Sequence, residues 1–262
     1  MKRNKDGYTV ITGASSGIGR ETAKAFAERG SNLILTARRM ERLEALRREL
    51  RERYPGLEIV LRKADLSESD EVLSLYESVK DYPLRTWVNN AGVGDYGRVG
   101  ERDAETIRRL LRLDVEALAM LSMLFVRDFR DTDGAQLINV SSCGGYTIVP
   151  NAVVYCAAKF FVSAFTEGLA RELRAAGAKM QAKVFAPAAT KTEFGKTANH
   201  VSEYDYRRAF EAYHTSAQAA AFLLELHESD QTVGAVERDS LTFHLCGPQL
   251  PYAGDSRQNQ RL

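Results

Sequence analysis

Six short runs rich in β-branched and apolar residues alternate with longer helical segments along most of this chain. They are predicted as strands over residues 8–12, 32–37, 57–64, 86–92, 135–142 and 182–187. Between the second and third, residues 40–53 bring Met40, Leu43, Leu46 and Leu50 onto one helical face. This alternation indicates an α/β fold in three layers, a doubly wound parallel sheet between two layers of helices. No linker interrupts it, so residues 1–262 are predicted to form a single domain.

Charge and composition restrict the partners of the 262-residue chain. Lys and Arg number 36 against 35 Asp and Glu, so no overall charge favours nucleic acid or a membrane surface. The apolar runs are shorter than the roughly 18 residues that span a bilayer, and residues 1–12 lack the apolar core of a signal peptide. Cys143, Cys156, Cys246 and the four histidines show no metal-binding spacing. We therefore expect a cytoplasmic protein that binds a small molecule and no metal, nucleic acid or membrane.

A glycine-rich turn, "TGASSGIGRETA" (12–23), follows the first predicted strand and opens a helix. Gly13, Gly17 and Gly19 let the backbone turn tightly and approach a pyrophosphate, whose charge would lie on the amides of the helix start. Ser15, Ser16 and Ile18 belong to the same predicted binding turn. The spacing is G-x-x-x-G-x-G rather than G-x-G-x-x-G, and a glycine-rich turn without a ligand is the alternative.

The end of the second predicted strand carries arginines where many dinucleotide-binding folds carry an acid. An acid there binds the ribose 2′-hydroxyl, whereas an arginine accommodates a 2′-phosphate. The sequence reads "TARRMERL", with Arg38 before the helix and Arg39 next to it. Both are assigned to the cofactor, and NADP(H) is predicted. Arg42 and the later arginines of this helix are interpreted as a solvated face.

Tyr155 and Lys159 stand four residues apart in the apolar stretch "VVYCAAKFF" (153–161). On a helix this spacing brings both side chains to the same face. A tyrosine that packs in the core beside a lysine that reaches solvent is the structural alternative.

Four motifs together resemble the short-chain dehydrogenase/reductase family: "TGASSGIG" (12–19), "NNAG" (89–92), "NVSS" (139–142) and "YCAAK" (155–159). The resemblance implies a Rossmann-like fold, a bound nicotinamide dinucleotide, and Ser142, Tyr155 and Lys159 as reacting side chains. It also implies a homodimer or homotetramer built through the helices that carry Asp114 and Tyr155. The further cofactor contacts that it implies are Asp65, Leu66, Asn90, Ala91, Gly92, Pro187 and Thr192, with Tyr155 and Lys159 themselves.

A physical argument supports the pairing of Tyr155 with Lys159. A ketone that accepts a hydride needs a proton, and a free tyrosine with a pKa of about 10 is a poor donor near neutral pH. A unit charge about 4 Å away contributes about 4 kcal/mol at an effective dielectric constant of about 20, which lowers a pKa by about 3 units. We expect Tyr155 to donate or accept the proton while Ser142 holds the substrate oxygen.

Three features depart from the family pattern. Asp114 falls on an apolar stripe with Ile107, Leu110, Leu111, Leu118 and Leu121, and by the resemblance it replaces the asparagine of the fourth catalytic position. If a backbone carbonyl binds the water of the proton relay, Asp114 can keep the relay working. If the relay needs the side-chain amide of asparagine as a donor, Asp114 cannot replace it. Pro187-Ala188 replaces Pro-Gly, so the loop is expected to be set differently. The segment of about residues 188–214 is expected to cover a small polar substrate, because residues 193–215 are polar, charged and tyrosine-rich and lack strand character.

Three classes of function follow. The first is an NADP-dependent carbonyl reductase or alcohol dehydrogenase (EC 1.1.1.-). The second is an epimerase or dehydratase on the same scaffold. The third is an NADP-binding sensor that has lost turnover.

Overall fold

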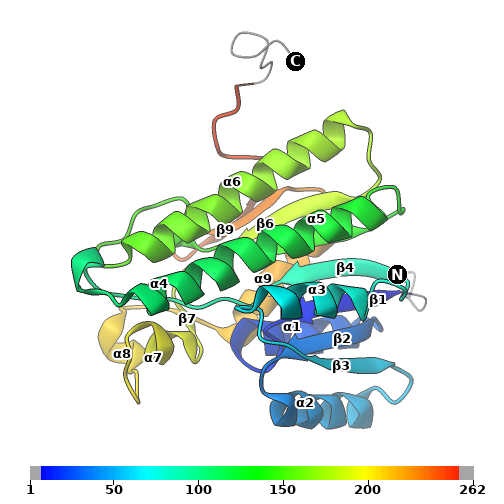
Figure 1. The fold of residues 1–262 in the computed structure, drawn as a ribbon, viewed down its shortest axis with the longest axis horizontal. Helices are drawn as coiled ribbons and strands as arrows, with labels where there is room; N and C mark the ends of the chain where they lie inside the picture. The colour runs from blue at the N-terminus through cyan, green and yellow to red at the C-terminus, as the bar shows by residue number, and fades with distance from the viewer. Residues whose placement is uncertain (1–6, 254–262) are drawn as a thin grey trace.

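A computed structural model describes residues 7–253 of the chain (Figure 1). The strands are β1 (Tyr8–Thr12), β2 (Asn32–Ala37), β3 (Ile59–Lys63), β4 (Leu84–Asn89), β5 (Gln136–Val140), β6 (Gln181–Ala186), β7 (Thr190–Lys191), β8 (His214–Thr215), β9 (Val233–Val236) and β10 (Phe243–Cys246). The α-helices are α1 (Gly17–Glu28), α2 (Met40–Arg53), α3 (Ser69–Glu77), α4 (Ala104–Leu111), α5 (Leu118–Phe129), α6 (Val153–Ala175), α7 (Phe194–Ala198), α8 (Tyr206–Ala209) and α9 (Ser216–Glu228). Two 3₁₀ turns, η1 (Val99–Glu101) and η3 (Cys143–Gly145), and a π-helical turn, η2 (Arg112–Ala117), complete the elements.

Eight strands form one sheet in the order β10-β9-β6-β5-β4-β1-β2-β3. All neighbours are parallel except β10, which runs antiparallel to β9. The chain first builds outward from β1 to β3 and then crosses to β4 on the other side of β1. The change of direction between β1 and β4 leaves a crevice at the carboxyl ends of the strands, where doubly wound folds bind ligands.

Helices cover both faces of the sheet, and each face has its own core. One core joins the sheet to α3, α5 and α6 through buried residues such as Tyr76, Trp87 and Phe125. The other joins it to α1, α2 and α9 through residues such as Phe26, Leu43 and Leu223. Strand β1 is buried along its whole length, as expected for a strand with helices on both faces. The predicted α/β fold with a Rossmann-like doubly wound sheet in three layers is confirmed.

The six predicted strands are present, with ends that differ by up to three residues. Sequence reasoning missed β9 and β10, and it missed β7 and its partner β8, the latter within residues 193–215, which were expected to lack strands. The predicted helix over residues 104–125 is interrupted by η2. Leu111, the last residue of α4, is 41% exposed, so the predicted continuous apolar stripe is wrong at this position.

Helix α6 is, among residues 7–253, the one helix long and apolar enough to cross a bilayer by length and composition. Half of its most apolar window is buried inside the protein, where the helix packs along β6. Residues 1–6 and 254–262 lie outside the described residues. The first range belongs to the segment expected to lack a signal-peptide core, and both belong to the predicted single domain.

Candidate active site

A cavity of about 520 Å³ opens at the carboxyl ends of the central strands. Most of the predicted site residues line it: Gly13, Ser15, Ser16, Gly17, Ile18, Arg38, Arg39, Asp65, Leu66, Asn90, Ala91, Gly92, Ser142, Tyr155, Lys159, Pro187 and Thr192. Gly19 and Asp114 do not line the cavity. Gly19 packs against Gly13 and Asn90, and Asp114 contacts Lys159. Within the described residues, no group of three potential metal-ligating side chains occurs.

The glycine-rich turn is shaped by close contacts between β1, β4 and α1. Gly13 has a φ of +68°, a conformation that favours glycine. A Cβ atom on Gly19 would lie 2.6 Å from the carbonyl oxygen of Gly13 and 2.4 Å from Nδ2 of Asn90. Asn90 Nδ2 donates to the carbonyl of Thr12 at 2.9 Å, so the loop after β4 is tied to the end of β1. The turn therefore leaves the first backbone amides of α1 facing the cavity.

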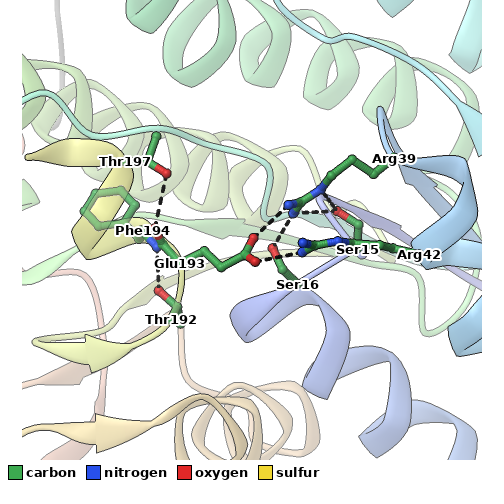
Figure 2. A network of polar contacts seen from close by, with 8 residues as sticks. All are labelled: Ser15, Ser16, Arg39, Arg42, Thr192, Glu193, Phe194 and Thr197. Atoms are coloured by element: carbon green, nitrogen blue, oxygen red, sulfur yellow. Dashed lines mark hydrogen bonds and ion pairs between the residues drawn. The ribbon is translucent and has the colours of Figure 1, made fainter. Parts of the chain in front are cut away.

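The two predicted cofactor arginines have different partners. Arg38 is half exposed and makes one weak contact, 3.5 Å to Asp65, whose other oxygen accepts hydrogen bonds from Ser67. Arg39 is held more firmly, since it donates to Ser16 at 2.9 Å and to Ser15 at 3.2 Å (Figure 2).

Arg42 was expected in a solvated face and its side chain is 43% exposed, but it also has a partner that was not predicted. Its Nη1 atom donates to Oε1 of Glu193 at 2.7 Å. Arg39 binds the other oxygen of the same carboxylate at 2.8 Å. The contacts join residues more than 150 positions apart, so no local sequence pattern reveals them.

Tyr155 and Lys159 project from the first turns of α6, with Ser142 opposite them at the end of β5. Nζ of Lys159 lies 5.7 Å from the centre of the Tyr155 ring and donates to the carbonyl of Val140 at 3.2 Å. Ser141 points into the protein, where its hydroxyl bonds the Lys159 carbonyl at 2.9 Å. Ser142 accepts the amide hydrogen of Gly144 at 3.1 Å and faces the cavity.

The Tyr155 ring is surrounded by other aromatic rings. Phe194 and Tyr96 contact it at centroid distances of 5.4 and 6.1 Å. Burial, followed by Tyr96, raises the pKa of Tyr155 well above its usual value, while the Ser142 hydroxyl acts in the opposite direction. The expectation that a single ammonium suffices to bring this pKa near neutrality is not met in this structure, because burial has the largest effect and a counter-charge beside Lys159 also raises the pKa.

That counter-charge is Asp114. Its Oδ2 atom lies 2.9 Å from Nζ of Lys159, and both side chains are buried. Oδ1 accepts the amide hydrogen of Val93 at 2.8 Å. Burial raises the pKa of Asp114 above the usual carboxyl range, and Lys159 and the Val93 amide oppose this rise. Asp114 lies in the π-helical turn η2, a kind of irregularity often found at functional sites.

The segment of residues 188–214, which includes α7 and α8, contributes residues between Ala188 and Ala212 to the wall of the cavity. Its aromatic side chains contact one another, with Tyr204 and Phe210 at 4.9 and 5.9 Å from Tyr206. One end is anchored by Asp95, a buried carboxylate that accepts a hydrogen bond from Arg102 at 2.7 Å and contacts His200 Nε2 at 2.6 Å.

Several lining residues were not predicted: Tyr96, Cys143, Val149, Glu193, Phe194, Tyr204, Tyr206, Phe210, Ala212, Arg238 and Leu241. The tyrosine-rich composition of residues 193–215 is the signal that pointed to some of them. Ala188 has no positive φ, so the Pro187-Ala188 loop has an ordinary backbone conformation. Its Pro187 carbonyl accepts the amide hydrogen of Cys143 at 2.8 Å.

Comparison with known proteins agrees with this geometry. A sulfoacetaldehyde reductase of Chromohalobacter salexigens is 35% identical over 188 residues, which covers 70% of this chain and 72% of that protein. A short-chain dehydrogenase from Sphingobium yanoikuyae, solved in complex with NADPH, has a TM-score of 0.79 and 28% identity, covering 87% of this chain and 86% of the other. The bulky-bulky ketone specific alcohol dehydrogenase from Comamonas testosteroni has a TM-score of 0.76 and 27% identity, covering 87% and 84%. The short chain dehydrogenase family model matches residues 8–203, and this chain belongs to that family of oxidoreductases.

Proposed function

We propose that this protein is an NADP(H)-dependent oxidoreductase that transfers a hydride between the nicotinamide and a carbonyl or secondary alcohol. The observation that carries the proposal is the convergence of Ser142, Tyr155 and Lys159 on the same cavity as the glycine-rich turn. A tyrosine that merely packed in the core beside a solvated lysine would not meet a serine and a dinucleotide-type turn in one cavity.

The donors around the cavity fit a phosphorylated dinucleotide. The start of α1 offers backbone amides and the positive end of a helix dipole to a pyrophosphate. Arg38 follows β2 directly and is held more weakly than Arg39, so it is the residue that we assign to a 2′-phosphate, with Asp65 beside the adenine. Asn90, Ala91 and Gly92 would follow the adenosine ribose, and Pro187 and Thr192 the nicotinamide. When bound, the cofactor supplies or accepts the hydride.

The side chains of this chain supply the proton and hold the substrate. Ser142 Oγ would hold the reacting oxygen by a hydrogen bond. Tyr155 Oη would give that oxygen a proton during reduction and take it back during oxidation. Lys159 would stabilise the tyrosinate with its positive charge, in balance with Asp114.

The walls of the substrate end favour a ketone or aldehyde with an apolar or aromatic body. Tyr96, Phe194, Tyr206 and Phe210 line this end of the cavity. The composition of the covering segment was interpreted as favouring a small polar substrate, whereas the aromatic residues that it contributes to the cavity wall lead us to propose an apolar body. The likeness to the Comamonas testosteroni enzyme named for bulky-bulky ketones supports the same class.

Assembly, location and domain organisation are part of the proposal. Helices α5 and α6 lie next to each other on one side of the sheet (Figure 1). They expose Met123 and Val153, which are 57% and 48% accessible, and this supports a homodimer or homotetramer built through these helices. The continuous eight-stranded sheet supports a single domain over residues 1–262, and the balanced charge supports a cytoplasmic protein without nucleic-acid or membrane partners.

The test is NADPH oxidation against a panel of aryl ketones, bulky dialkyl ketones, sugars, a sulfonated aldehyde and steroids. The Tyr155→Phe variant is run in parallel, because it removes the proton and keeps the ring. We expect turnover on a carbonyl with an apolar body, reduced at least about a hundredfold in Tyr155→Phe, the low end of a general acid's contribution. Tight NADPH binding without turnover on any carbonyl would overturn the reductase assignment and favour an epimerase or a sensor.

A further inference from the structure

One carboxylate joins the two sides of the cofactor cleft. Glu193 accepts hydrogen bonds from Arg39 at 2.8 Å and from Arg42 at 2.7 Å, one on each of its oxygens. Figure 2 shows this arrangement, with the two guanidinium groups on one side of the carboxylate and the backbone of the covering segment on the other. We call the three residues Arg39, Arg42 and Glu193 the arginine latch.

The latch lies beside the glycine-rich turn. Glu193 follows Thr192 at the start of the covering segment, directly before α7. Arg39 and Arg42 belong to the start of α2, at the far side of the turn. Arg39 also donates to Ser15 and Ser16 in the turn itself, so a chain of contacts runs from α2 across the turn to the covering segment (Figure 2). A dinucleotide lying along the turn would be enclosed beneath this chain of contacts.

The latch is charged throughout the physiological pH range and remains open to salt. The hydrogen bonds from Arg42 and Arg39 lower the pKa of Glu193 to about 2, against the opposing effect of its partial burial. The three side chains are between 34% and 43% exposed, so ions can screen the attraction. Ion pairs with this exposure are weak enough to open and close during a catalytic cycle.

We propose that Glu193 is a positioning residue that fastens the covering segment to the start of α2 and thereby slows the release of the bound cofactor. This inference rests on the proposed function, since it takes a nicotinamide dinucleotide as the enclosed ligand. Arg38, not the latch, is assigned to the 2′-phosphate, so the latch retains NADPH and NADH to the same degree.

The test is the dissociation rate of each reduced cofactor, followed by its fluorescence after stopped-flow displacement with excess oxidised cofactor. In Glu193→Gln we expect release of NADPH and of NADH to be about fivefold faster, in line with the loss of two partly exposed ion pairs. Arg42→Gln breaks one of the two ion pairs and leaves the contact between Arg39 and Glu193, so it should give a smaller increase of about twofold. Because Arg42 acts on release only through Glu193, the double variant should release the cofactors no faster than Glu193→Gln alone.

Glu203→Gln is the matched control. Glu203 is an exposed acid of the same covering segment that neither lines the cavity nor forms an ion pair within residues 7–253. Its release rates should equal those of the wild type. Added salt should speed release from the wild type and the control, and have little effect on Glu193→Gln.

Two results would overturn the latch. One is a release rate in Glu193→Gln equal to that of the control. The other is slower release of NADPH alone, which would mean that Glu193 repels the 2′-phosphate instead of closing the cleft. Neither depends on turnover, whereas failure of the wild type to bind either cofactor would overturn the proposed function itself.

Discussion

Replacing Asp114 with asparagine should move the pH dependence of catalysis without changing the shape of the site. The amide oxygen of the variant can still accept the Val93 amide hydrogen that Oδ1 accepts at 2.8 Å. What changes is charge, because Lys159 loses the carboxylate that lies 2.9 Å from its ammonium. Tyr155 then experiences the full positive charge of Lys159.

The size of the shift follows from two distances. Asp114 lies 2.9 Å from Nζ of Lys159, which lies 5.7 Å from the Tyr155 ring centre, so together they put the carboxylate within about 9 Å of that ring. A unit charge at about 9 Å contributes about 2 kcal/mol at an effective dielectric constant of about 20. Since one pKa unit corresponds to about 1.4 kcal/mol, the pKa of Tyr155 should fall by about 1.4 units in Asp114→Asn.

The assay is kcat/KM for alcohol oxidation by NADP⁺ as a function of pH, because oxidation requires Tyr155 to accept a proton. The midpoint should lie about 1.4 units lower in the variant than in the wild type. Glu116→Gln is the control, since Glu116 lies in the same π-helical turn, is exposed and contacts Ser69 at 2.6 Å. Equal midpoints in Asp114→Asn and the wild type would refute the reasoning, because they would mean that the charge of Asp114 has no effect on the pKa of Tyr155.

The other predictions concern cofactor choice and acid stability. Arg38→Gln should reduce the preference for NADPH over NADH about tenfold, the loss of a charged hydrogen bond, as measured by fluorescence titration; an unchanged ratio would remove Arg38 from the 2′-phosphate site. His227 has its pKa lowered to about 4 by burial and then by Lys183. Between pH 6.5 and about 4 the unfolded protein therefore binds the extra proton, and His227 should lower the free energy of unfolding by up to about 3 kcal/mol as pH falls through this range. Urea unfolding of His227→Gln should show a shallower loss between pH 7 and about pH 4.5, and parallel curves would contradict this assignment.

The sequence predicts the central fold and the positions of the motifs well, for a physical reason. A parallel strand buried on both faces needs a continuous apolar run, which stands out in β1, β2 and β4. Because such strands all end at the same edge, motifs that follow them must converge. The four-residue strands β9 and β10 carry too little of this signal to be recognised, although they complete the sheet and bring Arg238 and Leu241 to the cavity.

What escapes sequence reasoning is the pairing of charges across large separations. Asp114 was singled out because an acid on an apolar stripe is unusual, but its direct contact with Lys159 depends on how η2 meets α6. The interpretation of Arg42 as a solvated residue missed its contact with Glu193 for the same reason, since Glu193 approaches from another part of the fold. The spacing of charges along a helix predicts ion pairs between near neighbours in the sequence. It does not predict pairs between elements that come together only when the sheet has formed.

The π-helical turn η2 limits how far the helices of this protein can be made regular by engineering without loss of the active-site geometry. A π turn holds one residue more than an α turn, and each residue turns a helix by about 100°. Removing one residue from Arg112–Ala117 would give an unbroken α-helix from α4 to α5. Since the extra residue is contained in one turn, α4 and α5 would keep their orientations, but the turn that presents Asp114 to Lys159 would be lost. Consensus design or thermostabilisation that rewards ideal helices would therefore select against the charge balance of the active site, and variants gained in this way should be screened for activity before melting temperature.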